Sequence, residues 1–237
     1  MSTNSISRFF RWFFFRSRGD SPFKTILIHI TLLICCVIAV YPALRVVTIS
    51  LRPNDTLLTT DLRIIPENAT LNNYKEVLFG APEKNRQSDF FLWVWNSISV
   101  VAVTSVISVI LAAISAYAFS RFKFPGRAAG LVFLLTTQMI PAGMLLLPLF
   151  IMIAKLKMIN TSLGLIIAYA VTSVPLTIWT LKGYYDTIPV DLEEAALIDG
   201  ASRLTVFTKI ILPLSTPALA IAFLFSFMGG WSEYLVA

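Results

Sequence analysis

Few side chains in this sequence could perform acid–base, metal or nucleophilic chemistry, and they lie far apart. The single histidine, His29, lies in an apolar stretch without a second ligand or a carboxylate beside it, so no metal or acid–base role is predicted. Ser232 lies in the string GGWSEY, where Tyr234 replaces the last glycine of a G-x-S-x-G nucleophile motif. The phosphate-binding pattern G-x-x-x-x-G-K-S/T does not occur. We therefore predict no catalytic residue, no metal and no cofactor bound by this chain.

The strongest local pattern is the segment 189–213, which reads PVDLEEAALIDGASRLTVFTKIILP. Its acidic residues crowd the start of a predicted helix, where carboxylates complement the helix dipole, and Gly200 supplies its end. Ser202 can cap a second helix that finishes at Pro213. One face of this second helix is predicted to be apolar, with Leu204, Phe207, Ile210 and Ile211. The residues alone predict two surface helices, which form either an ordinary connector or a docking site for a basic partner.

Long apolar stretches occupy most of the remaining chain. Five of them contain no Asp, Glu, Lys or Arg, namely residues 25–44, 90–120, 128–154, 158–181 and 210–232. About 20 apolar residues, at roughly 1.5 Å each, cross a hydrocarbon core of about 30 Å. With 57% hydrophobic and only 14% charged residues, the chain lacks the polar surface of a soluble globule. We predict an all-α integral membrane protein with five visible spans in a lipid bilayer.

The distribution of charge predicts the orientation of these spans. Basic residues dominate the tail 1–24 and the connection 121–127, whereas acids and bases are balanced in the loop of about 50–89. Because positive residues favour the cytoplasmic side, the amino terminus and segment 189–213 are predicted to be cytoplasmic, and the loop external. The net charge of +6 thus reflects topology, and no nucleic-acid partner is predicted. The tail, which mixes arginines with aromatic rings, either lies in the membrane interface or is a disordered basic segment. The rest, 25–237, is predicted to be one membrane domain.

The spacing within segment 189–213 carries a family resemblance. Glu194, Ala195 and Ala196, then Gly200 after three residues, then Ile210, Leu212 and Pro213 match in full the EAA motif. This string resembles that of the membrane subunits of binding-protein-dependent ABC importers. The strings at 95–127, 138–150 and 179–196 are similar to the MalG-type branch, which serves carbohydrate uptake. The resemblance covers the chain from about Phe91 to its end.

The resemblance implies a MetI-like ABC importer permease fold with six spans in the bacterial cell inner membrane. It implies a second homologous permease subunit of MalF type, a homodimeric cytoplasmic ATPase of MalK type that holds ATP and Mg, and an external sugar-binding protein. Segment 189–213 would be the coupling helix that contacts this ATPase. Its contacts would come from Glu194, Ala195, Ala196, Asp199, Gly200, Ile210, Leu212 and Pro213. The substrate would be a malto-oligosaccharide or a related sugar.

Two departures from the family pattern are visible. The external loop 155–162 is shorter than in the maltose-system prototype, where it reaches toward the sugar in the binding protein. The chain also ends at the edge of its fifth span, so we expect it to be truncated before a sixth.

Polar residues within the spans are candidates for the translocation path. Glu233 lies about 16 residues, or roughly 24 Å, from the cytoplasmic end of the fifth span, which places it toward the outside. Gly229, Gly230 and Trp231 beside it either form a bend and an aromatic surface for sugar, or Glu233 simply reaches the outer interface. The remaining candidates, which either line the path or bond neighbouring helices, are Asn96, Gln138, Tyr169 and Thr172.

An ion-coupled secondary transporter is the alternative class, because such proteins are also polytopic. They commonly place ionisable groups at the middle of the membrane, and spans two to four contain none. We therefore expect the purified protein, reconstituted alone in vesicles, to catalyse no sugar uptake when an ion gradient is imposed. Gradient-driven uptake by this chain alone would establish the secondary transporter instead.

Overall fold

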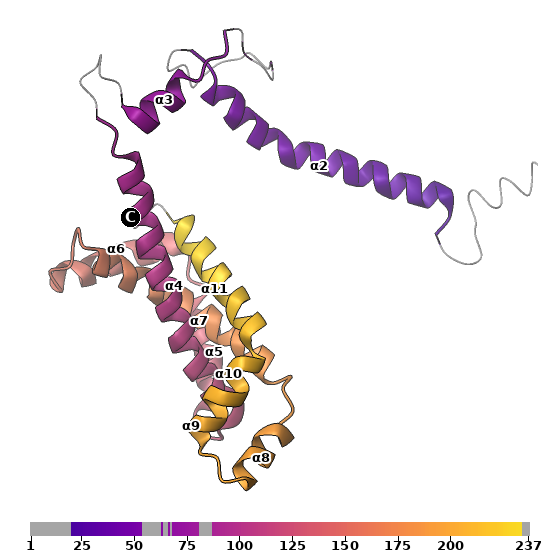
Figure 1. The fold of residues 1–237 in the computed structure, drawn as a ribbon, viewed down its shortest axis with the longest axis vertical. Coiled ribbons are helices and arrows are strands. Elements are labelled where there is room, and N and C mark those ends of the chain that lie inside the picture. Colours follow the sequence, from indigo (N-terminus) through magenta and orange to yellow (C-terminus); the bar gives the residue numbers. More distant parts are fainter. Residues whose placement is uncertain (1–19, 54–62, 64–65, 67, 81–86, 234–237) are drawn as a thin grey trace, which may run out of the picture. The chain divides into compact units, whose positions relative to one another are not determined.

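The computed structural model describes residues 20–53, 63, 66, 68–80 and 87–233. These residues form helices joined by turns and loops, which confirms the predicted all-α fold class (Figure 1). The predicted tail 1–24 lies mostly outside the described residues, as do parts of the predicted external loop. The chain divides into two units, Met1–Phe91 and Leu92–Ala237, which we describe separately.

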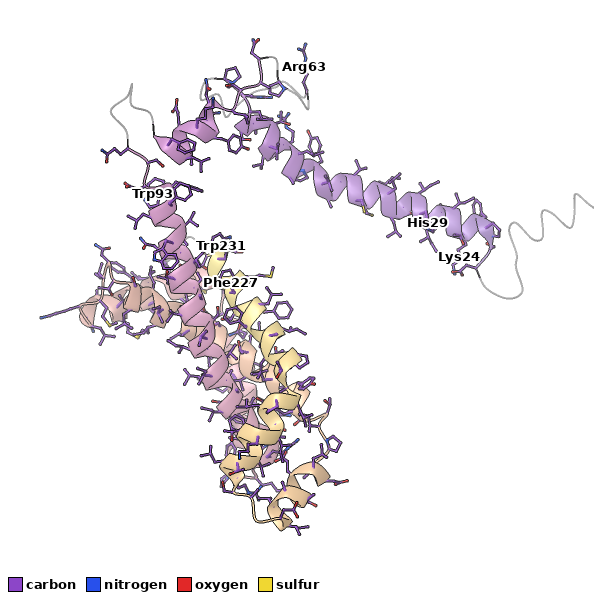
Figure 2. The ribbon with its side chains drawn as sticks, viewed as in Figure 1. Lys24, His29, Arg63, Trp93, Phe227 and Trp231 are labelled. Atoms are coloured by element: carbon purple, nitrogen blue, oxygen red, sulfur yellow. The ribbon has the colours of Figure 1, made fainter. Side chains whose placement is uncertain are left out.

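The first unit contains the long helix α2, Pro22–Ser50, which includes the predicted span 25–44. Pro22 occupies the start of the helix, where its missing N–H costs nothing, and Ser21 caps it by accepting from the Lys24 amide at 3.3 Å. Nδ1 of His29 lies 2.7 Å from the carbonyl oxygen of Thr25, one turn earlier (Figure 2). None of the most apolar window of α2 is buried against other described residues, as suits a helix surrounded by lipid.

A short helix, α3 (Asn72–Phe79), is hydrogen-bonded to the carboxyl end of α2. The side-chain amide of Asn73 donates to the carbonyl oxygens of Ser50 and Arg52, both at 3.0 Å. The hydroxyls of Tyr74 and Ser50 lie 2.6 Å apart. These bonds satisfy carbonyls that the end of a helix leaves without intrahelical partners.

The second unit is built around α4 (Phe90–Arg121), α7 (Ser162–Tyr185) and α11 (Thr216–Trp231). Small residues follow one face of α4, where Ser105, Ser108, Ala112 and Ala116 are all fully buried. Side chains of this size let membrane helices approach closely, and the hydroxyls of Ser108 and Ser173 join α4 to α7 at 2.7 Å. The core continues through aliphatic and aromatic residues of α7 and the segment after it.

The predicted span 128–154 is two helices rather than one. α5 (Arg127–Thr137) and α6 (Ala142–Lys155) are separated at 138–141. Pro141 has no N–H to donate and disfavours helical geometry at the residue before it. The helices have 11 and 14 residues, so each is shorter than the ~20 residues that cross a bilayer. The prediction of one continuous span over this stretch is corrected accordingly.

The chain then passes through α8 (Asp191–Ile198), α9 (Arg203–Val206), the π-helix η2 (Phe207–Ile211) and α10 (Leu212–Leu214) before α11. The helical segments Arg203–Leu214 and Thr216–Trp231 are bent by 75° relative to each other. Pro217 lies in the first turn of α11, where proline is tolerated, whereas Pro148 and Pro175 lie inside α6 and α7. Within the described residues, three helices are long and apolar enough to span, or four if the bent pair is one span.

Gly164 provides a test of the packing between α7 and the turn before it. A Cβ at this position would lie 2.5 Å from the carbonyl oxygen of Met158, which is a backbone atom. We expect Gly164→Ala to lower the free energy of unfolding by about 1–3 kcal/mol, because the backbone must shift. Thermal unfolding of the purified protein in detergent measures this.

Gly183→Ala in the same helix is the matched control. A Cβ there meets nothing within 4 Å, and alanine is the better helix former. An equal loss of stability in both variants would contradict the steric explanation.

Candidate functional site

Helix α8 presents the acidic half of the segment 189–213. Asp191, Glu193 and Glu194 occupy its first turn, where negative charge complements the positive end of the helix dipole. At its other end Gly200 adopts a positive φ of 86°, and the amides of Gly200 and Ala201 donate to carbonyls of Leu197 and Ala196 at 3.1 and 3.0 Å. This is a Schellman ending, which glycine permits at least cost. The predicted helix stop at Gly200 is confirmed.

The second helical part begins as predicted. The hydroxyl of Ser202 accepts from the Thr205 amide at 3.2 Å and so caps α9. The helix that begins with α9 then continues as the wider π-helix η2, because Pro213 has no N–H to donate to the carbonyl of Lys209 four residues earlier.

The buried face of this part differs from the predicted one. Leu204 is 70% exposed, whereas Val206, Phe207 and Ile211 are buried. Ile210 is only half-buried. Burial is thus confirmed for Phe207 and Ile211, whereas Leu204, which lies in α9 before η2 begins, is exposed.

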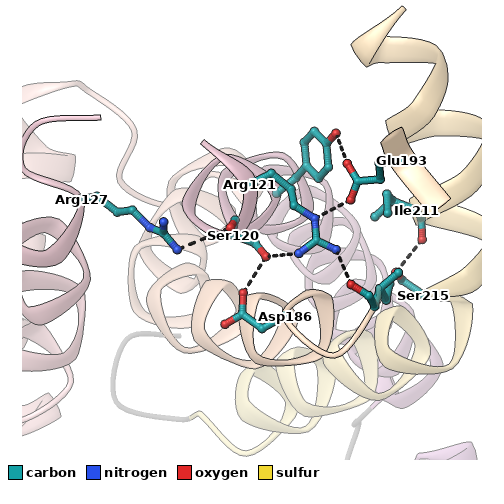
Figure 3. Close-up of polar contacts among 9 residues, drawn as sticks. Ser120, Arg121, Arg127, Asp186, Glu193, Ile211 and Ser215 are labelled. Atoms are coloured by element: carbon teal, nitrogen blue, oxygen red, sulfur yellow. Dashed lines mark hydrogen bonds and ion pairs between the residues drawn. The ribbon is translucent and has the colours of Figure 1, made fainter. Parts of the chain in front are cut away.

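The central contact of this region is a buried ion pair between α4 and α8. The guanidinium Nε of Arg121 donates to one carboxylate oxygen of Glu193, and the hydroxyl of Tyr117 donates to the other at 2.8 Å (Figure 3). The side chains of Arg121 and Glu193 are only 7% and 3% exposed. Both carboxylate oxygens thus have a donor, which is what a buried charge requires.

Arg121 also holds the turn that joins α7 to α8. One terminal nitrogen donates to the carbonyl of Ile188 at 2.9 Å, and the other to the Ser120 hydroxyl at 3.0 Å. Ser120 in turn donates to Asp186 at 2.6 Å, and Lys182 pairs with the same carboxylate. Burial opposes ionisation of Asp186, but these hydrogen bonds outweigh it and lower the pKa of the carboxyl below its usual value.

Aromatic rings connect the same end of α4 to α9 and η2. The ring of Tyr117 lies 4.8 Å from that of Phe207 and contacts Phe122 edge to face at 5.8 Å. The guanidinium of Arg203 lies over the Phe122 ring, 5.6 Å from its centroid. The end of α4 therefore contacts α8, α9, η2 and the turn before α8.

The residues of the predicted docking segment divide into two groups. Glu194, Ala195, Asp199, Gly200 and Pro213 are exposed, so they are available to a partner. Ala196, Ile210 and Leu212 are half-buried, and Leu212 packs against the core. The structure thus places the first half of the motif on an exposed helix and the second half at the base of α11.

Sequence reasoning missed the role of Glu193. It counted Glu193 among the acids at a helix start and Arg121 among the charges that set topology. Helical spacing contains part of the missing signal. The residues three and four positions after Glu193 are Ala196 and Leu197, both half-buried, whereas the residue four positions after Glu194 is Ile198, which is exposed. The partner Arg121 is 72 residues away and only the folded chain identifies it.

A cavity of about 1060 Å³ lies at the end of the second unit opposite α8. It is a half-open space bordered by the starts of α4 and α7, by α6, by residues 158–161 and by the end of α11. Five of the residues predicted for a path line it together, namely Asn96, Tyr169, Gly230, Trp231 and Glu233. Gly229 lines a neighbouring cavity of about 200 Å³. Gln138 instead bonds two helices, because its amide donates to the carbonyl of Thr172 at 3.2 Å.

Metal ligation has no visible site in the described part of the chain. No group of three or more His, Cys, Asp or Glu residues there lies close enough together to hold an ion.

Comparison with known proteins identifies relatives of this chain. Residues 106–237 match the family described as binding-protein-dependent transport system inner membrane component. The chain is 37% identical over 209 residues to the galactooligosaccharides transport system permease protein GanQ of Bacillus subtilis, covering 88% of this chain and 72% of the relative. It is 36% identical over 224 residues to the maltose/maltodextrin transport system permease protein MalG of Escherichia coli K12, covering 88% and 73%.

A solved structure also resembles the fold. It belongs to a bacterial ABC transporter involved in the import of the acidic polysaccharide alginate, with a TM-score of 0.69 and 25% sequence identity. The similarity covers 93% of this chain and 74% of the other.

The buried pair can be tested by removing one charge. We expect Glu193→Gln to lower the free energy of unfolding by about 3–5 kcal/mol, because it leaves the Arg121 guanidinium buried without its counter-charge. Limited proteolysis of the 189–202 segment should accelerate in parallel with the loss of thermal stability.

The neighbouring exposed acid supplies the matched control. Glu194→Gln removes the same charge one residue away and should leave stability unchanged to within about 0.5 kcal/mol. If the two variants unfold alike, the pair does not hold α8.

Proposed function

The chain belongs to the family of binding-protein-dependent transport system inner membrane components, and from this premise we propose that it forms half of the translocation path of an ATP-driven carbohydrate importer. Family membership makes it a membrane transport subunit. The carbohydrate substrate is supported by the names of the relatives, which transport galactooligosaccharides or maltodextrins, and by the alginate importer. A malto-oligosaccharide or a related sugar is the substrate we propose.

The importer would contain several other subunits. We propose a second, homologous permease of MalF type in the membrane, a homodimeric ATPase of MalK type that holds ATP and Mg, and an external sugar-binding protein. The extensive apolar surface that α4 and α11 leave exposed supports a membrane partner and lipid contact. Hydrolysis of ATP would occur wholly in the ATPase, while this chain performs no covalent chemistry.

The observation that carries the coupling proposal is the contrast between two adjacent acids. Glu193 is buried against Arg121, while Glu194, the next residue of the same helix, is exposed. The Arg121–Glu193 pair opposes rotation of α8 about its own axis, so that α8 can move together with α4 when a partner subunit displaces it. Glu194 would meet a basic group of the ATPase through a charge-assisted hydrogen bond, and Asp199 and Gly200 would allow close approach at the other end of α8.

Force on α8 would then reach the membrane helices by two routes. The Arg121–Glu193 pair leads to α4, and the hydrogen bonds around Ile188 and Asp186 lead to α7. Such a route agrees with the predicted topology, in which the amino terminus and the segment that contains α8 are cytoplasmic. Alternating access would follow from tilting these helices against those of the second permease.

Charge reversal at Glu194 tests the coupling. In the assembled importer, Glu194→Lys should lower ATP-dependent sugar uptake about tenfold or more, because the contact with a basic partner becomes repulsive. Less ATPase should remain on washed membranes. Gly200→Val should act similarly, since valine is strained at a φ of 86°.

Asp191→Asn is the control, because it removes another exposed charge from the first turn of α8. It should leave uptake and ATPase retention near their normal values. Normal uptake and normal retention in both Glu194→Lys and Gly200→Val would refute the coupling assignment.

A further inference from the structure

Two adjacent cavities lie along α4, α7 and α11. The larger, of about 1060 Å³, and the smaller, of about 200 Å³, are both lined by Tyr169, Gly230 and Glu233. Because these three residues border both spaces, the cavities meet there. The larger cavity is at the end of the unit that carries Trp231, and the smaller lies deeper between the helices.

Trp231 presents an aromatic surface to the larger cavity. Its ring stacks on that of Phe227 with a centroid distance of 6.0 Å and an interplanar angle of 13° (Figure 2). Phe227 in turn stacks on Phe223 at 6.1 Å. This row along α11 restrains the orientation of the indole, yet the residue stays 51% exposed. A restrained and exposed indole can pack against the apolar C–H face of a sugar ring.

The polar groups around Trp231 match the other surface of a sugar. Asn96 is exposed at the start of α4 and carries an amide that both donates and accepts, while the carboxylate of Glu233 accepts. Neighbouring hydroxyls of a pyranose need that combination of donors and acceptors. The volume suits a ligand larger than a monosaccharide, since pockets for small molecules are about 300–1,000 Å³.

The smaller cavity continues this chemistry with hydroxyl groups. Ser226 is only 7% exposed and its hydroxyl has no hydrogen-bond partner among the described residues. Thr104 and Thr177, on α4 and α7, line the same space and are also buried. A buried hydroxyl without a partner is unfavourable, and a hydroxyl of a passing polyol would satisfy it.

From this arrangement we infer that the larger cavity is an oligosaccharide-binding subsite, in which Trp231 stacks on a sugar ring while Asn96 and Glu233 bind its hydroxyls. Ser226 receives the sugar deeper in the path. This rests on the proposed function. The rival occupant is an apolar helix of the second permease, which would bury the exposed Asn96 amide without offering it a hydroxyl. The polar side chains therefore favour the sugar.

The experiment uses the complete importer in proteoliposomes with its binding protein and ATPase. Labelled maltotriose and a labelled galactose trisaccharide are the probes. We expect Trp231→Ala and Asn96→Ala to raise the KM for uptake at least fivefold, and Trp231→Phe to restore most of the loss. Assembly of the complex should stay near normal in each variant. Met228→Ala is the control, because Met228 is 56% exposed on α11 and lines neither cavity.

Failure of the proposed function and failure of the subsite alone give different results. If the wild-type importer takes up neither probe nor any other oligosaccharide, the proposed function fails and this inference fails with it. If wild-type uptake is normal and the KM values of Trp231→Ala and Asn96→Ala match that of Met228→Ala, only the subsite is refuted. Photo-crosslinking from position 231 to the second permease, together with unchanged KM values, would identify a helix as the occupant instead.

Discussion

The ion pair between Arg121 and Glu193 is the contact on which the arrangement of the second unit depends. Both side chains are almost fully buried, and a charge in such surroundings is tolerated only when every donor and acceptor is used. The remaining nitrogens of Arg121 therefore bond the Ile188 carbonyl and the Ser120 hydroxyl. One side chain at the end of α4 thereby holds both α8 and the turn between α7 and α8.

The same pair explains how adjacent acids acquire different roles. Successive residues of a helix point about 100° apart, so burial of Glu193 leaves Glu194 at the surface. The buried face of α8 is held by Arg121 and Tyr117 of α4. A coupling helix needs such a fixed contact if it is to transmit force. Small residues along α4 are buried in one core with residues of α7 and α11, so that displacement at α8 can reach the cavities at the other end.

Much of the fold could be predicted because a helix that crosses a bilayer needs about 20 consecutive apolar residues. The uncharged stretches around α2, α4 and α7 have that length, and the structure has long helices there. The stretch 128–154 is also long enough and yet is broken at Pro141, since apolar composition does not report local backbone geometry. The predicted apolar face likewise included Leu204, which is exposed in α9, because a helical period shows where apolar residues recur and does not report which neighbour covers them.

The sequence by itself determined the helical membrane class, the family resemblance through the spacing from Glu194 to Pro213, and the stop at Gly200. Each of these depends on residues that are near one another in the chain, where periodicity, capping and motif spacing operate. Only the tertiary structure decided that Arg121 pairs with Glu193, and that Asn96, Tyr169 and Trp231 surround one cavity. These groups are separated by tens of residues, and their meeting depends on how the helices pack, which no local pattern specifies.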